Sequence, residues 1–208
     1  MTVADLEALV AARRERLGEA HPETLAAMLD LAEALWGEGR VTRALPLEEA
    51  VVAGRRAVYG AAHPETLKAL GKLAVTRGQL GDLAGARRLQ EEVVAGMRAA
   101  YGAEARDTLR AVNNLAGTVA ALGDAETARA MLDETIATLA RVFGDDDPDT
   151  LTALGNLAAL LWREGERDDA FALQEHVAAA LSRTRGADDL LARNARAVLD
   201  GMLREAGF

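Results

Sequence analysis

The sequence has no cysteine, and aromatic residues make up only 3% of its 208 positions. Without cysteine, neither a disulfide framework nor thiolate chemistry is available. Because apolar residues still account for 50% of the chain, alanine, leucine and valine must form most of the packed interior. With four prolines and few β-branched runs, helix is the expected secondary structure throughout.

Positive charge and long apolar segments are also scarce. The net charge is −9, whereas proteins that bind nucleic acid or anionic membranes are usually basic, so we expect neither partner. No segment reaches the ~18 consecutive apolar residues of a membrane-spanning helix, and the N-terminus does not resemble a signal peptide. These features predict a cytoplasmic protein. Only Lys68 and Lys72 of the 24 basic residues are lysine, a bias typical of high-GC bacterial genes.

Recognisable catalytic and metal-binding motifs are missing as well. The chain has no phosphate-binding loop, no nucleophile elbow, no zinc-protease motif and no dinucleotide fingerprint. His21 and His63 each precede a proline and would need two more ligands to hold zinc, so we interpret them as helix-start caps. The acidic run 145–147 lacks the spaced ligands of a calcium loop. We therefore expect no enzyme activity, no cofactor and no metal.

What the sequence has in abundance is repetition with a period of 42 residues. The segment 21–25, His-Pro-Glu-Thr-Leu, recurs at 63–67, and degraded forms follow at 105–109 and 147–151. One glycine column comprises Gly18, Gly60, Gly102, Gly144 and Gly186, and a second comprises Gly39, Gly81, Gly123, Gly165 and Gly207. Leu-Ala recurs at 31–32, 73–74, 115–116 and 157–158, and a single alanine recurs at Ala44, Ala86, Ala128 and Ala170. So many coincident columns indicate an internal repeat.

Each period divides into two helices at its glycines. The first is predicted from about Pro22 to Trp36, because proline is favoured at the first helical position and apolar residues follow at helical spacing. The second is predicted from about Thr42 to Tyr59, and the alanine column should lie where two helices touch. The register gives about ten helices in one domain, 1–208. Its expected parts are a lone helix at 3–17, full repeats at 18–59, 60–101, 102–143 and 144–185, and a capping helix within 186–208.

The columns resemble the tetratricopeptide repeat (TPR). Its pattern of Leu-Ala, a glycine seven residues later and a further alanine is present here, whereas HEAT and armadillo repeats share only the period. The longer period, the His-Pro-Glu-Thr-Leu opening, and the segments 113–116 (Asn-Asn-Leu-Ala) and 155–158 (Gly-Asn-Leu-Ala) resemble the kinesin light chain type. The resemblance covers nearly the whole chain. It implies an all-α, right-handed α-solenoid of stacked antiparallel helix pairs that acts as a protein-binding scaffold.

In arrays of this family the first helix of each pair lines a concave groove, so the resemblance places binding residues on those helices. Lys68 and Lys72 are four residues apart and share a helix face, and with Arg110 they predict a basic site for an acidic peptide segment. The alternative is that the lysines are ordinary solvated residues. Asparagine amides could pair with a peptide backbone at three further positions, Asn113, Asn114 and Asn156.

Two tryptophans occupy one column three repeats apart, Trp36 and Trp162. Each is either an aromatic anchor at the groove rim or a cover for the following loop. Mid-helix glycines at Gly71 and Gly155 indicate either room for a ligand backbone or close helix contact. Tyr59, Tyr101 and Phe143 are expected to seal adjacent repeats.

The favoured function is a protein-interaction module that binds a peptide or partner protein as a monomer or weak homo-oligomer. The alternative is a structural protein that self-assembles through the ends of the array. Leu6, Leu9, Val10 and Leu17 of the lone first helix are the residues that would seek such a partner.

Overall fold

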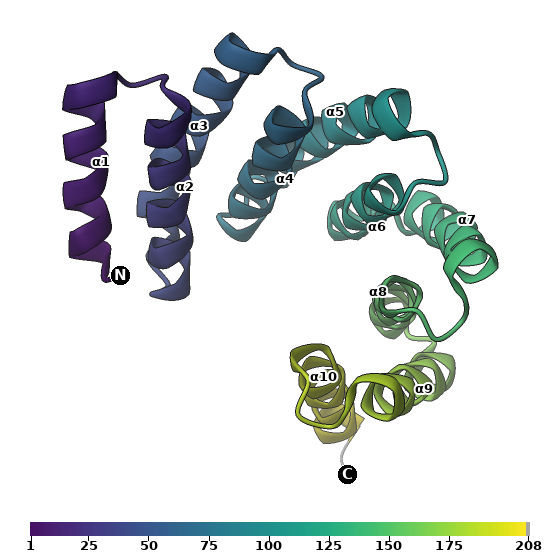
Figure 1. Cartoon of the computed structure of the whole chain (residues 1–208). Coiled ribbons are helices and arrows are strands. Elements are labelled where there is room, and N and C mark those ends of the chain that lie inside the picture. The colour runs from purple at the N-terminus through teal and green to yellow at the C-terminus, as the bar shows by residue number, and fades with distance from the viewer. Residues whose placement is uncertain (207–208) are drawn as a thin grey trace. The chain divides into compact units, whose positions relative to one another are not determined.

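The computed structural model describes residues 1–206, which form ten α-helices and no strand (Figure 1). The helices are α1 Val3–Leu17, α2 Pro22–Gly37, α3 Val41–Tyr59, α4 Pro64–Gln79, α5 Leu83–Tyr101, α6 Arg106–Ala121, α7 Ala125–Phe143, α8 Pro148–Glu164, α9 Arg167–Arg185 and α10 Leu190–Ala206. The predicted all-α repeat fold is confirmed. Gly207, the last member of its glycine column, lies outside the described residues.

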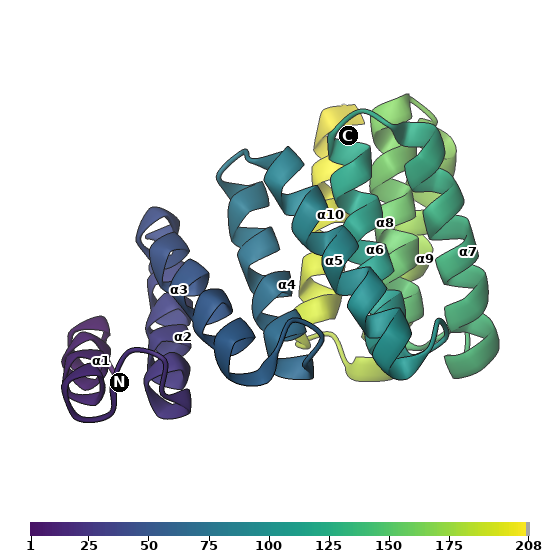
Figure 2. The same ribbon diagram turned by 90° about the horizontal axis from the view of Figure 1, so that it is seen from above.

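The chain divides into two compact units, Met1–Ala103 with α1–α5 and Glu104–Phe208 with α6–α10. Within each unit every helix packs against the next one along the chain, and in the second unit α6 also contacts α8. Seen from above, α2 lies between α1 and α3 in the first unit (Figure 2). Within a unit a second helix supports two first helices, as α3 supports α2 and α4 and α7 supports α6 and α8. A single domain over 1–208 stays a prediction.

The repeated opening segment starts the first helices by capping their exposed backbone amides. Nδ1 of His21 accepts a hydrogen bond from the amide of Glu23 at 3.2 Å, and His63 repeats this with Glu65 at the same distance. Both histidines therefore act as the predicted caps. The threonine that follows is buried and anchors the preceding loop, since the Thr66 hydroxyl donates to the carbonyl of Gly60 at 2.8 Å.

Glycine ends the helices because the backbone turns there into the positive-φ region. Gly165 adopts the left-handed conformation with φ 87° after α8, which agrees with the predicted division of each period at its glycines. Gly60 has φ 90° and ψ 164° after α3, and its amide donates to the carbonyl of Arg56. Side chains with a Cβ rarely adopt such angles, which explains glycine at these positions.

The interior contains the predicted alanine column, and each member is almost completely buried (Ala44, Ala86, Ala128 and Ala170). Close contacts between helices also occur at glycines of the second helices, which meet leucines of the first helices. A Cβ at Gly96 would lie 2.6 Å from Cδ2 of Leu67, and Gly54 meets Leu25 in the same way. A Cβ added at Gly71, in contrast, would meet no atom within 4 Å, so the interpretation of close helix contact is wrong there.

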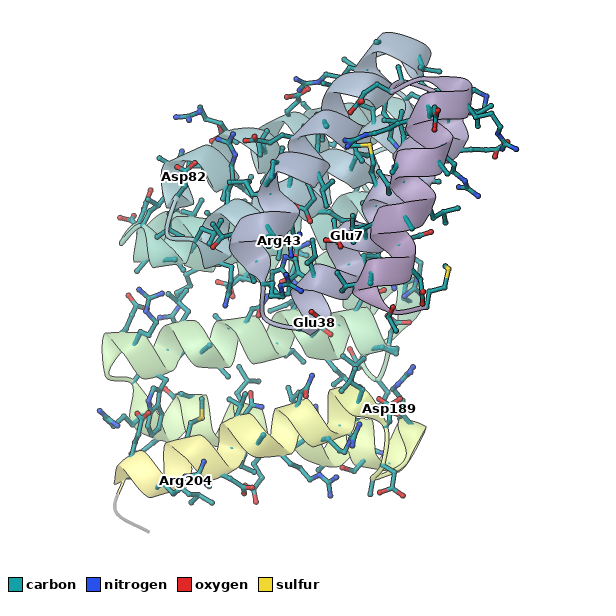
Figure 3. All side chains as sticks on the ribbon, turned by 90° about the vertical axis from the view of Figure 1, so that its left-hand side faces the viewer. Glu7, Glu38, Arg43, Asp82, Asp189 and Arg204 are labelled. Atoms are coloured by element: carbon teal, nitrogen blue, oxygen red, sulfur yellow. The ribbon has the colours of Figure 1, made fainter. Side chains whose placement is uncertain are left out.

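The apolar face of α1 is covered by its own chain. Val3, Leu6 and Val10 are buried in the packing of α1 on α2. At its polar side, Arg43 of α3 donates to Glu7 of α1 at 2.6 Å, and Figure 3 shows the two labelled side chains close together. Leu6 and Val10, predicted above to seek an external partner, are therefore already buried against α2 of the same chain.

The two tyrosines in the column of aromatic residues before the glycines are less buried than a sealing role requires. Tyr59 and Tyr101 are both well exposed. Tyr59 stacks on the His63 ring at 4.7 Å between centroids, which links it to the next helix pair. Phe143 lies under the guanidinium of Arg106 at 4.0 Å and packs against Leu109 and Ala153, which belong to adjacent repeats, so it does contribute to their packing. The two tyrosines lie at the surface.

Candidate functional site

Lys68 and Lys72 lie on the exposed face of α4, and both are engaged with carboxylates of the chain. Nζ of Lys68 lies 3.2 Å from Oε1 of Glu65, three residues earlier on the same helix. Lys72 forms an ion pair with Glu33 on the neighbouring first helix, α2. All of these side chains remain substantially exposed, so the pairs are accessible to solvent and to a ligand.

Arg110 belongs to the second unit, whereas the two lysines belong to the first. Its Nε donates to Oδ1 of Asp149 on α8 at 2.6 Å, and Asp107 lies 3.7 Å away. The structure therefore describes two basic sets, each with its own acidic partners.

Two of the three asparagines are committed to one another. Asn113 is only 6% exposed, and its Oδ1 accepts a hydrogen bond from Nδ2 of Asn156 at 3.0 Å. This bond joins α6 to α8, so these amides hold the repeats together. Asn114 is exposed beside them. With Arg110, Asn113 and Asp149 it lines a cavity of about 260 Å³.

Trp36 is half-buried at the end of α2, and its Nε1 donates to the hydroxyl of Thr76 on α4 at 2.8 Å. The ring lines a cavity of about 400 Å³ between α2, α3 and α4. Trp162 at the end of α8 donates to Glu205 at 2.9 Å and lines a cavity of about 500 Å³. The guanidinium of Arg167 lies 4.5 Å from the centre of that ring. Neither tryptophan is a fully buried core residue.

Sequence reasoning missed Glu48 of α3, which lines the cavity beside Trp36. The residue is 5% exposed, and its Oε2 has no hydrogen-bond partner among the described residues. Burial raises the pKa of the carboxyl above its ordinary value, partly offset by a hydrogen bond from Thr76. A signal was present, because the residues 42 and 126 positions later are Gln90 and Gln174, also polar and buried.

A second missed group surrounds Arg106, which stands where α2, α4 and α8 begin with proline. The Arg106 guanidinium donates to Asp147 at 2.9 Å and also bonds Asp149. These hydrogen bonds raise the arginine pKa further above its already high value. Burial alone would raise the pKa of Asp147, but the Arg106 bond and the amide of Asp149 outweigh it and lower that pKa. The group fixes the start of α8.

Two features bear on chemistry and membranes. No group of three or more metal-ligating side chains occurs within residues 1–206. Within the same residues, no helix is both long and apolar enough to cross a bilayer.

The sequence pattern of the tetratricopeptide repeat matches residues 31–99 and 107–183, which together are most of the chain. The chain belongs to the tetratricopeptide repeat family. TPRs are generally protein-interaction modules and are typically non-enzymatic.

Solved structures refine the type of TPR. A putative kinesin light chain from Podosopora anserina with nearly identical TPR-like repeats is 30% identical, with a TM-score of 0.73, 88% of this chain covered and 87% of that one. A variant of that protein gives 30% identity and a TM-score of 0.76, covering 88% and 86%. BtubC (BKLC) from P. vanneervenii shares the fold at 19% identity and a TM-score of 0.73, covering 99% and 83%. These TPRs are therefore of the kinesin light chain-like type. A comparison with curated proteins finds no match.

Proposed function

We propose that the chain binds a peptide or partner protein on the exposed faces of its first helices, the faces that the family resemblance assigns to a concave groove. The observation that carries this proposal is the pair of exposed lysines on α4, Lys68 and Lys72, on a first helix of a TPR array. An acidic segment of the partner is the ligand that these lysines favour.

The acidic partners already on the chain do not prevent such binding. Exposed ion pairs contribute only ~0–1 kcal/mol each, because water and salt screen them. A ligand with several carboxylates can therefore displace Glu65 from Lys68 and Glu33 from Lys72 at little cost. In the second unit the same exchange would release Arg110, although Asp149 is more buried and holds it more firmly.

The competing proposal, self-assembly through the array ends, has less support. Val3, Leu6 and Val10 of α1 are buried in its packing on α2, and Leu9 and Leu17 are partly buried. The exposed large apolar residues on α10 are Leu190 and Val198, which are scattered singly. We therefore retain the interaction module as the function.

Selection of random peptides displayed on phage, with the immobilised chain as bait, tests the proposal. We expect the wild type to enrich peptides rich in Asp and Glu, and Lys68→Glu with Lys72→Glu to lose that enrichment. A matched control reverses two exposed arginines on a second helix, Arg87→Glu with Arg98→Glu, and should select as the wild type does. Failure of the wild type to enrich any peptide family would contradict the proposed function.

A further inference from the structure

The cavity at the end of α2 contains a buried carboxylate beside an aromatic ring. Its volume is about 400 Å³, in the range of small-ligand sites. Trp36 and Glu33 of α2, Glu48 of α3, and Lys72, Val75 and Thr76 of α4 line it. Val75 is 50% exposed, so the cavity opens to solvent on the first-helix side.

Hydrogen bonds fix the ring and one side of the carboxylate. The indole N–H of Trp36 donates to Thr76, and the Thr76 hydroxyl donates in turn to Glu48. The second carboxylate oxygen, Oε2 of Glu48, has no partner within the described part of the chain. A buried charged oxygen left unpaired is costly, so the site is built to accept a further donor.

The charges of the lining select the kind of donor. Lys72 is engaged by Glu33 at the rim, so the cation of the cavity is already neutralised. The Glu48 carboxylate remains uncompensated, which disfavours an anion and favours a cation. A metal ion would need several oxygen ligands, whereas most of the surface that the lining residues expose to the cavity is apolar. An organic cation on an aliphatic stem fits both parts, because aromatic faces attract ammonium and guanidinium groups.

The equivalent tryptophan of the second unit already holds such a cation from its own chain. The Arg167 guanidinium lies over Trp162 at 4.5 Å. The residue that corresponds to Arg167 by the 42-residue register is Val41, so α3 offers no guanidinium from that position to Trp36. The residue that corresponds to Glu48 is Gln174, which is uncharged. Beside Trp36 the chain thus provides the carboxylate of Glu48 but has no arginine equivalent to Arg167.

We propose that the cavity receives the ammonium or guanidinium group of a partner's lysine or arginine side chain. The cation lies between Oε2 of Glu48 and the face of Trp36, and the stem contacts Val75. This inference rests on the proposed function, because it names a residue type that the bound partner contributes next to Lys72.

Nuclear magnetic resonance of the labelled protein tests the chemistry directly. The two tryptophans give two indole N–H signals, which Trp162→Phe assigns. The probes are the N-acetyl N-methylamides of lysine and arginine, with that of norleucine as an uncharged control. We expect both cationic probes to shift the Trp36 signal saturably, norleucine amide to have no comparable effect, and Trp162 to respond little.

Two variants separate Glu48 from general charge effects. Glu48→Gln should lower the affinity for the cationic probes about tenfold or more, since hydrogen bonds to charged groups are strong. Glu49→Gln removes an exposed carboxylate from the same helix and should leave the binding unchanged. Equal binding of norleucine amide, unchanged binding by Glu48→Gln, or no saturable shift at Trp36 would each overturn the proposal.

Phage selection on Glu48→Gln distinguishes a peptide source from a small free amine. If a partner supplies the cation, wild-type selections should enrich lysine or arginine at a fixed position, and the variant should lose that enrichment while retaining acidic residues. Enriched peptides without a fixed basic residue would overturn the proposal that a partner's side chain supplies the cation, but they would leave the proposed function standing. No enriched peptide at all would contradict the proposed function, whereas the amide titration would still report on the cavity.

Discussion

Ala86→Leu tests the packing register on which the fold depends. Ala86 lies on α5 and is 1% exposed. A Cβ added at Gly78 of α4 would lie 3.8 Å from the Cβ of Ala86. Helix α5 therefore lies against α4 here with no room for three more carbons. Overpacking a core of this kind costs about 1–3 kcal/mol. At about 2–4 °C per kcal/mol for a chain of this size, the melting temperature should fall by roughly 2–12 °C.

Circular dichroism at increasing temperature measures that fall, and Ala84→Leu provides the control. Ala84 is exposed in the first turns of the same helix, so leucine there should change the melt little. Equal melting of Ala86→Leu and the wild type would refute the reasoning, because it would mean that the alanine column does not separate two touching helices. A large loss in Ala84→Leu would refute it equally.

Two further substitutions test the special positions of the first unit. Gly71→Ala should stabilise the protein by up to ~1 kcal/mol in urea unfolding, because a mid-helix glycine is unfavourable and an added Cβ meets no atom within 4 Å. Glu48→Gln should raise the stability at neutral pH by about 1 kcal/mol or more, since it removes a buried, partly unpaired charge. Because the folded pKa of Glu48 is raised, its penalty is full above that pKa and fades as the pH falls toward the ordinary value of 4.5. The gain from Glu48→Gln should therefore shrink in acid, and a gain that grew in acid would contradict this account.

The two results for Glu48 are linked. A carboxylate that lines a cavity and lowers the stability of the fold is consistent with a binding role, since functional sites commonly reduce stability. Gln90 and Gln174 stand at the equivalent positions, so the array itself demonstrates that an amide is compatible with this packing. Glu48→Gln should then give a more stable protein that binds lysine and arginine probes less well.

Helix positions could be predicted from the sequence because their signals are local. Proline and a capping residue start α2, α4 and α8, and positive-φ glycines follow both kinds of helix. The second helix was predicted from about Thr42 and begins at Val41 in the structure, where Arg40 provides no side-chain cap to mark the start. Errors in the predicted ends of the helices stay small when the repeats share the residues that start and end them.

Side-chain partners were harder to predict because they depend on neighbouring helices. The lysines were expected to form a basic site, and their acidic partners, Glu65 for Lys68 and Glu33 for Lys72, were not predicted. The signal that could have been used is the register, since adjacent first helices bring together residues 39 apart. Both Lys72 with Glu33 and Arg110 with Asp149 have that spacing.

The buried polar groups were the least predictable. Asn113 belongs to the best match to the kinesin light chain pattern and was expected to bind a peptide, yet it is buried and bonds Asn156. Whether a polar residue at helical spacing faces solvent or a neighbouring helix depends on how two helices rotate against each other. Glu48 was missed for the same reason.

Chemical-shift mapping of a selected peptide on the labelled protein tests the central claim most directly, that first helices form the binding face. The backbone amides that shift should belong to α2, α4, α6 or α8, with the Trp36 indole among the responding signals. Shifts confined to the outer surfaces of α3, α5, α7 and α9 would contradict the claim, because they would place the partner on the second helices of the pairs.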